Sequence, residues 1–191
     1  MQIISTEFPG LLILEPVVHK DARGFFLETF REEHLSGQNF HCVQANQSFS
    51  VEKGVLRGLH FQRPPMAQAK LIWVTRGEVF DVVVDLRRGS PTFGRQFSLR
   101  LSAENFQRLF VPKGFAHGYL TLTPNVEFNY MVDTYYSPAH EGGLLWNDPD
   151  LGIAWPLEMQ GAASPDSDLP VLSPKDRILP CFKDLGTIFQ Y

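Results

Sequence analysis

Short apolar segments recur along the chain up to about residue 136, and most of them alternate apolar with polar positions. They are rich in β-branched and aromatic residues and are separated by glycine, proline, asparagine or aspartate, a pattern typical of β-strands joined by turns. The clearest segment is 78–86, in which every even position after Glu78 is apolar while Asp81 and Asp85 share the other face. We expect that strand to have one packed face and one partly open face.

The same criteria predict eight strands, at residues 11–14, 24–30, 71–75, 79–86, 97–101, 108–111, 118–122 and 127–132. Eight strands at this spacing indicate a mainly β sandwich. Helical signals are few: residues 32–35 and 103–106 each suit a single turn, the second with Ser102 as its N-cap. From residue 147 the composition predicts a loop-rich tail, with a short helix around 177–185.

The 191 residues suit one domain, with core strands at about 8–136 and the loop-rich tail at about 147–191, because sandwiches of about 200 residues often form a single unit. A hydrophobic fraction of 43% and a charged fraction of 20% allow a large core and exclude a disordered chain. No internal repeat or linker separates two cores.

A net charge of -4 with no block of like charges gives no reason to expect a nucleic-acid partner or a membrane-binding basic face. The N-terminal residues lack the pattern of an export signal, and the apolar runs are far shorter than the about 20 residues that span a bilayer. Cys42 and Cys181 lie far apart and form no metal or disulfide motif. We therefore expect a cytoplasmic protein with free thiols.

Candidate chemistry is concentrated in residues 57–62, where a cation, an imidazole and an amide interrupt an otherwise buried strand. Alternation along a strand predicts that Gly58, His60 and Gln62 share one face and that Arg57 lies on the other. A histidine beside a glycine then faces a space. A core histidine bonded to a buried carbonyl is the ordinary alternative, and this segment alone leaves both interpretations open.

A second segment, 112–118, ends one strand in a Pro-x-Gly turn and places His117 at the start of the next. It resembles the second motif of the cupin superfamily, which implies a jelly roll, or double-stranded β-helix. The first cupin motif carries two histidines and a glutamate, but this chain has His60 followed by Gln62. Two histidines without a certain carboxylate fall short of the three or more ligands of a usual metal site, so we expect no metal.

The departure from the metal-binding pattern indicates one group within the superfamily. In order along the chain, the segments 21–28, 44–46, 55–62, 77–82, 112–118, 135–138 and 145–149 resemble the dTDP-4-dehydrorhamnose 3,5-epimerase family. The resemblance runs from about Phe8 to Asp176, and its specificity comes from the joint order of the pieces. It implies an isomerase that inverts C3 and C5 of dTDP-4-dehydro-6-deoxy-D-glucose through enolate intermediates, without a cofactor.

The resemblance also implies four catalytic roles. His60 matches the base, Asp176 the carboxylate that orients it, Lys70 the cation at the C4 oxygen, and Tyr130 the acid on the opposite face of the sugar. Taken alone, Lys70 also fits an exposed strand-edge lysine, Asp176 a solvated loop acid, and Tyr130 a core or rim residue.

The substrate-binding residues implied by the resemblance are mostly charged or polar. Arg23 and Arg57 match diphosphate contacts, with Lys175 and His117 nearby, and Tyr135 matches a residue that stacks on thymine. Further polar contacts to the base, sugar and phosphates match Glu28, Gln44, Asn46 and Glu141. Exposed charges and strand-edge or turn hydrogen bonds are the ordinary alternatives. Ala45 departs from the family, in which this position is often polar.

The resemblance to this family also implies a homodimer in which N-terminal strands of one chain complete the partner's site. That arrangement would let Arg23 and Glu28 act across an interface. The product would serve dTDP-L-rhamnose biosynthesis for lipopolysaccharide or another cell-surface polysaccharide. Three alternatives remain open from the sequence. They are an epimerase acting at C3 only or C5 only, a metal-dependent cupin, and a non-catalytic sugar-binding jelly roll.

Overall fold

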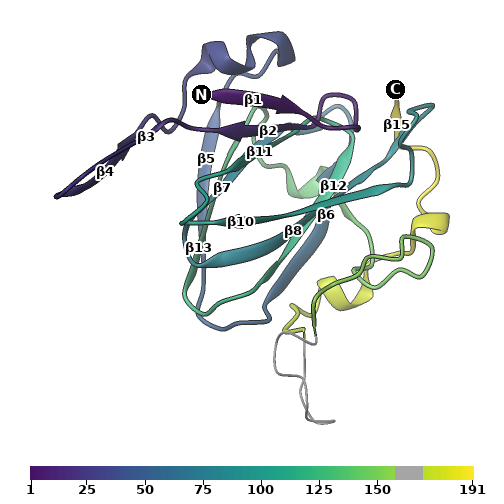
Figure 1. Ribbon diagram of the computed structural model, residues 1–191. Coiled ribbons are helices and arrows are strands. Elements are labelled where there is room, and N and C mark those ends of the chain that lie inside the picture. Colours follow the sequence, from purple (N-terminus) through teal and green to yellow (C-terminus); the bar gives the residue numbers. More distant parts are fainter. Residues whose placement is uncertain (158–169) are drawn as a thin grey trace.

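The computed structural model describes residues 1–157 and 170–191, in which two antiparallel sheets face each other as a β-sandwich (Figure 1). The six-stranded sheet has the order β1 (Gln2–Ser5), β2 (Leu12–Glu15), β11 (Arg108–Val111), β7 (Lys70–Arg76), β13 (Val126–Val132) and β5 (Gln44–Ser50). The five-stranded sheet has the order β10 (Gln96–Ser102), β8 (Glu78–Asp85), β12 (Phe115–Thr121), β6 (Leu56–Gln62) and β14 (Glu141–Gly143). The predicted mainly β, cupin-like fold is confirmed.

Two smaller elements extend from the sandwich. The hairpin of β3 (Val18–Asp21) and β4 (Gly24–Leu27) projects from the body as an arm, seen at the left of Figure 1. The C-terminal strand β15 (Phe189–Gln190) pairs in parallel with β9 (Arg87–Arg88). Four 3-10 turns complete the described chain: η1 (Glu32–Gln38), η2 (Pro138–His140), η4 (Asp176–Ile178) and η5 (Phe182–Asp184).

Three apolar clusters hold these layers together. The first lies between the sheets and includes Ile72 on one sheet and Val83 on the other, both fully buried. The second covers the outer face of the five-stranded sheet with residues of the C-terminal segment, including Trp155. The third packs η1 through Leu35 against the six-stranded sheet. Because apolar area is removed from water on both faces of each sheet, the sandwich presents a rigid frame for any site between the layers.

Every predicted strand overlaps a strand of the structure, although 24–30 extends three residues beyond the end of β4 at Leu27. The pattern missed β1, β3, β5, β9, β14 and β15. In β5 the sequence QANQSFS has no apolar face, because its partly or fully buried positions are the polar residues Gln44, Asn46, Ser48 and Ser50. Such a strand is stabilised by its ladder with β13 and gives no hydrophobic periodicity.

Two local predictions were wrong. The second face of 79–86 is not open, because Asp81 and Asp85 are both fully buried and hydrogen-bonded. The turn expected at 103–106 is present at residues 103–105, and the Ser102 hydroxyl accepts hydrogen bonds from two of its backbone amides as a cap would. The helix expected at 177–185 is replaced by η4 and η5, which lie on either side of Pro180. Residues 32–35 do form a turn within η1.

No helix among the described residues is long and apolar enough to cross a membrane.

Candidate active site

A cavity of about 340 Å³ opens between the two sheets, on the side where β5, β13 and β7 face β6, β12 and β14. Eight of the residues predicted from the sequence to act in catalysis or binding line it: Arg57, His60, Lys70, His117, Tyr130, Glu141, Lys175 and Asp176. The other lining residues are Ser48, Phe61, Gln62, Gln68, Tyr119, Phe128, Tyr136 and Ser173. The fold therefore gathers residues from distant parts of the chain at one place.

Strand β6 places both Arg57 and His60 on the cavity wall, although simple alternation predicted opposite faces. His60 pairs with His117 of β12, and Arg57 pairs with Tyr119. Three residue steps along β6 therefore match two residue steps along β12. This bulge reverses the alternation between the two side chains. Gly58 lies inside it with φ of +129°, and a Cβ there would stand 2.5 Å from the Gly118 Cα, so the close approach requires glycine.

His60 is paired with a buried carboxylate from the C-terminal segment. Its Nε2 lies 2.8 Å from Oδ1 of Asp176, which is 4% exposed in η4. The Asp176 backbone amide donates to the Ser173 hydroxyl at 3.2 Å. Burial opposes ionisation of Asp176, but contacts with His60, Ser173 and Lys175 lower its pKa below the usual value. The carboxylate is thus held ionised beside the ring, where it can orient the imidazole and stabilise its protonated form.

Lys70 stands on the opposite wall, at the start of β7, a central strand paired with both β11 and β13. Its side chain is partly buried and lines the cavity, so it is not the exposed edge lysine that the sequence alone allowed. Burial lowers the pKa of Lys70 to about 8, opposed by the charges of Asp81 and Glu141. A desolvated ammonium group in a cavity interacts strongly with any negative charge that forms nearby.

Tyr130 also lies on the six-stranded sheet and therefore faces His60 across the cavity. Burial raises its pKa, partly offset by the charge of Arg57. The phenol is accordingly protonated at neutral pH and can donate its proton. A base on one wall and an acid on the facing wall are what inversion at a carbon centre requires.

Stacked aromatic rings form the floor of the cavity. The rings of Tyr119 and Phe128 lie 4.1 Å apart between centroids at an angle of 12°, and the His117 ring stacks on Phe128 at 5.9 Å. The Tyr119 hydroxyl is hydrogen-bonded to the Ser48 hydroxyl at 2.8 Å. Tyr119, Phe128 and Ser48 were not among the site residues expected from the sequence. Only the inward alternation of 117 and 119 along one strand could have indicated Tyr119.

The rim of the cavity carries a charged cluster around Glu141. The Glu141 carboxylate pairs with the Lys175 ammonium group and accepts a hydrogen bond from the Tyr136 hydroxyl at 3.0 Å. Its Oε1 lies 3.9 Å from Nδ1 of His60. Burial raises the pKa of Glu141, but Lys175, Tyr136 and His60 outweigh this and lower it.

The remaining rim residues predicted from the sequence lie near this cavity without lining it. Gln44 donates to Asn46 Oδ1 at 2.8 Å and accepts from the Tyr136 backbone amide at 3.1 Å, which ties β5 to the rim. Tyr135 is 64% exposed, whereas its neighbour Tyr136 lines the cavity.

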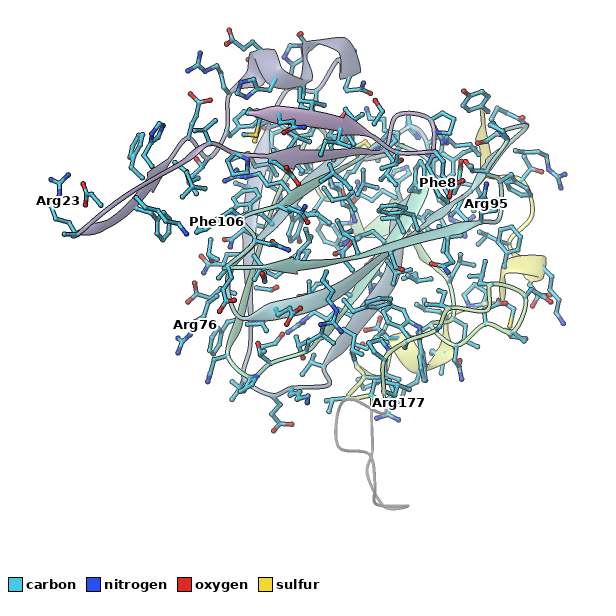
Figure 2. All side chains as sticks on the ribbon, viewed as in Figure 1. Phe8, Arg23, Arg76, Arg95, Phe106 and Arg177 are labelled. Atoms are coloured by element: carbon cyan, nitrogen blue, oxygen red, sulfur yellow. The ribbon has the colours of Figure 1, made fainter. Side chains whose placement is uncertain are left out.

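Arg23 and Glu28 are not brought to the cavity of their own chain. Arg23 lies at the tip of the arm, where its side chain is 90% exposed and pairs with Asp21 at 2.6 Å (Figure 2). Glu28 follows the arm and pairs with Arg31.

Gln62 supports the rim through a set of backbone hydrogen bonds. Its amide nitrogen donates to the carbonyl oxygens of Met66 at 2.7 Å and Tyr135 at 3.2 Å, and its amide oxygen accepts from the Ser137 amide at 2.6 Å. The residue is 4% exposed. Within residues 1–157 and 170–191, no group of three or more histidine, cysteine, aspartate or glutamate side chains is arranged to hold a metal ion.

An imidazole–carboxylate pair, a phenol on the facing wall and a partly buried lysine share one cavity of a cupin-like sandwich, and such groups can transfer protons to and from a bound ligand. A family profile described as dTDP-4-dehydrorhamnose 3,5-epimerase matches residues 5–184. The chain belongs to this family.

Individual relatives agree with this assignment. The chain is 50% identical over 183 residues to a dTDP-4-dehydrorhamnose 3,5-epimerase of Salmonella typhimurium, covering 94% of each chain. Its structure is similar to that of a dTDP-6-deoxy-D-glucose-3,5-epimerase from Legionella pneumophila in complex with dTDP-4-keto-L-rhamnose, with a TM-score of 0.90, 40% identity, and coverage of 100% and 98%. A 3'-monoepimerase from Streptomyces bikiniensis in complex with dTDP-quinovose is also similar, with a TM-score of 0.85, 35% identity, and coverage of 98% and 93%.

Proposed function

We propose that this protein inverts both C3 and C5 of dTDP-4-dehydro-6-deoxy-D-glucose to give dTDP-4-dehydro-L-rhamnose in dTDP-L-rhamnose biosynthesis. The observation that carries the proposal is the placement of His60 with Asp176 on one wall of the cavity and Tyr130 on the facing wall. The identity of the chain with the Salmonella typhimurium epimerase supports the choice of substrate.

The chemistry follows from the C4 carbonyl, which makes the hydrogens at C3 and C5 acidic. His60 removes one of these protons, and the electron pair of the broken C–H bond moves into the enolate, whose negative charge rests on the C4 oxygen. Lys70 stabilises that charge, and Asp176 stabilises the imidazolium that forms on His60. Tyr130 then delivers a proton from the opposite face, which inverts the carbon. No oxidation occurs, so the step needs no cofactor.

A general base contributes about 100-fold to 10,000-fold to such a step, and one preorganised donor at the oxyanion about 100-fold to 1,000-fold. The second inversion repeats the same proton transfers at the other carbon, after His60 and Tyr130 have exchanged protons with solvent.

The nucleotide end of the substrate is assigned to the cavity rim. Arg57, His117 and Lys175 supply positive charge or hydrogen-bond donors for the two phosphates, and Tyr135 offers an exposed ring on which thymine can stack. The remaining polar contacts to the base, sugar and phosphates come from Gln44, Asn46 and Glu141.

We further propose a homodimer in which the arm of one chain reaches the cavity of its partner. The arm projects from the body and exposes Phe25 and Phe26, and it carries Arg23 at its tip (Figures 1 and 2). An exposed aromatic hairpin is stabilised by burial against another surface. In this arrangement Arg23 and Glu28 contact the diphosphate and base of the partner's substrate. Residues 1–191 form one cytoplasmic domain in this proposal, and the sugar product serves a cell-surface polysaccharide.

The test is turnover of the proposed substrate in D2O, followed by NMR of the sugar. Deuterium at both C3 and C5 is expected. Label at C3 alone would instead favour a second candidate function, that of a monoepimerase. The similarity of the chain to the Streptomyces bikiniensis 3'-monoepimerase is the observation that supports this candidate. Nucleotide binding without label would indicate a sugar-binding jelly roll, and activity that follows a bound transition metal would indicate a metal-dependent cupin.

His60→Ala should abolish deuterium incorporation while leaving binding of dTDP largely intact, because the imidazole acts on the sugar. His41→Ala is the matched control, since His41 is exposed and pairs with Glu32 outside the cavity lining. Comparable incorporation in both variants would remove His60 as the base.

A further inference from the structure

A second imidazole–carboxylate pair lies directly behind the cavity wall. Nε2 of His117 is 2.9 Å from Oδ2 of Asp81, and the Asp81 side chain is completely buried. His117 lines the cavity and is the cross-strand partner of His60, so the two pairs stand on neighbouring strands of one sheet. The segment 77–82 that carries part of the family resemblance contains Asp81, but neither the resemblance as described above nor the proton transfers assign this residue a role.

The second oxygen of this carboxylate, Oδ1, is buried and has no hydrogen-bond partner among the described residues. A buried carboxylate is costly unless a cation or several donors compensate it, and one hydrogen bond from an imidazole compensates it only in part. The charge of an ionised Asp81 therefore acts on cationic groups that share the dry interior. Asp81 is the leading favourable charge on Lys70 and raises the pKa of that lysine against the effect of burial.

The other acidic groups around Lys70 are already paired. Glu141 on β14 pairs with Lys175, and Asp176 in η4 pairs with His60. These pairs leave little net negative charge for Lys70, although Glu141 contributes after Asp81.

The remaining ionisable groups of the cavity do not favour a charged lysine. Arg57 on β6 is a like charge, and His60 and His117 are neutral or positive. The three tyrosines, Tyr119, Tyr130 and Tyr136, all have raised pKa values and are neutral in the working range.

We propose that Asp81 is a positioning residue for the epimerisation: it holds the His117 ring in one orientation and keeps Lys70 in its ammonium form beside the developing enolate. This inference rests on the proposed role of Lys70 at the C4 oxygen. The reaction needs Lys70 charged, yet its site favours the neutral amine because it is desolvated. A carboxylate behind the wall supplies the missing charge without occupying space in the cavity or competing for the substrate.

The experiment determines kcat and KM for deuterium incorporation from about pH 6 to pH 10, in the wild type and in Asp81→Asn. This substitution keeps the shape of the side chain and removes its negative charge. Activity of the wild type should fall above about pH 8 as Lys70 loses its proton. An opposite charge typically shifts a pKa by about 1 to 3 units, so the alkaline limb of the variant should lie at least about one pH unit lower. Each unit corresponds to about tenfold in rate on that limb, in kcat rather than KM, because Lys70 acts on the enolate.

Asp85→Asn is the matched control. Asp85 lies on the same strand, is equally buried, and pairs with Arg87, Ser90 and Thr92 outside the cavity lining. Its substitution should lower thermal stability and leave the alkaline limb in place. An Asp81→Asn profile that superimposes on the wild type, or an equal displacement in both variants, would overturn the inference.

Two further measurements test the proposal if a variant folds poorly or if the protein does not turn over this substrate. His117→Gln retains the Asp81 charge, so its alkaline limb should not move to lower pH, and such a movement would contradict the proposal. NMR of the isotopically dimethylated lysines, with Lys70 assigned from Lys70→Arg, titrates the ammonium group directly. Unlabelled product from the wild type would contradict the proposed function, whereas an unchanged Lys70 titration in Asp81→Asn would contradict only the role of Asp81.

Discussion

Substitution of Gly58 by alanine tests whether the bulge in β6 is what holds Arg57 and His60 on the same wall. An alanine Cβ would lie 2.5 Å from the Gly118 Cα and 2.9 Å from the His117 carbonyl oxygen. Both contacts are backbone atoms of the adjacent strand, so no side chain can rotate away. The residue must also keep φ at +129°, a region that favours glycine.

The expected cost has two parts. A non-glycine residue at such a φ costs about 1 to 3 kcal/mol, and forcing one extra carbon into a packed site costs about 1 to 3 kcal/mol more. The sum of about 2 to 6 kcal/mol corresponds to a decrease in Tm of about 4 to 24 °C for a chain of this size, at about 2 to 4 °C per kcal/mol. Deuterium incorporation should fall as well, because separation of β6 from β12 displaces His60 from Asp176.

Gly24→Ala provides the control for backbone strain alone. Gly24 has φ of +135°, nearly the same as Gly58, but a Cβ there would meet nothing within 4 Å. Thermal unfolding followed by circular dichroism should therefore show a smaller decrease in Tm for Gly24→Ala than for Gly58→Ala. Equal decreases would refute the argument that close approach of the two strands requires glycine in the bulge.

Two further predictions concern the carboxylate behind His60 and the arm. The pKa of Asp176 is lower in the folded protein than its ordinary value of 3.8. The ionised carboxylate therefore stabilises the fold above about pH 3.8, and this contribution is lost as the pH falls through the lower pKa of the folded state. Acid unfolding should therefore show a stability difference between the wild type and Asp176→Asn that shrinks below about pH 4, and a difference independent of pH would contradict it. Arg23→Ala and His60→Ala should each be nearly inactive, but a mixture of the two should recover about a quarter of the wild-type activity, because half of the dimers are hybrids and each has one intact site. Activity that does not recover after subunit exchange would refute the crossed arm.

Local patterns in the sequence predicted the elements whose burial is one-sided or complete. Residues 71–75 form a nearly continuous apolar run, and residues 127–132 alternate polar with apolar positions in their first half. Both segments lie in the six-stranded sheet as strands. Strand β5 escaped prediction because its partly buried side chains are polar and face the region of the cavity, so the function of the strand removed its hydrophobic signal. The expected C-terminal helix failed for a related reason, since that segment is stabilised by packing on the five-stranded sheet instead of by helical hydrogen bonds.

By itself, the sequence determined the family, through motifs whose order along the chain is specific, and with it the candidates His60, Lys70, Tyr130 and Asp176. Only the tertiary structure decided how these groups face one another, because that depends on contacts between segments far apart in the sequence, such as the contact of His60 with Asp176. The bulge between β6 and β12 placed Arg57 with His60, and the burial of β8 placed the Asp81 carboxyl group behind the cavity wall in contact with His117. Periodicity describes one strand at a time, whereas register and desolvation belong to the packed sheets.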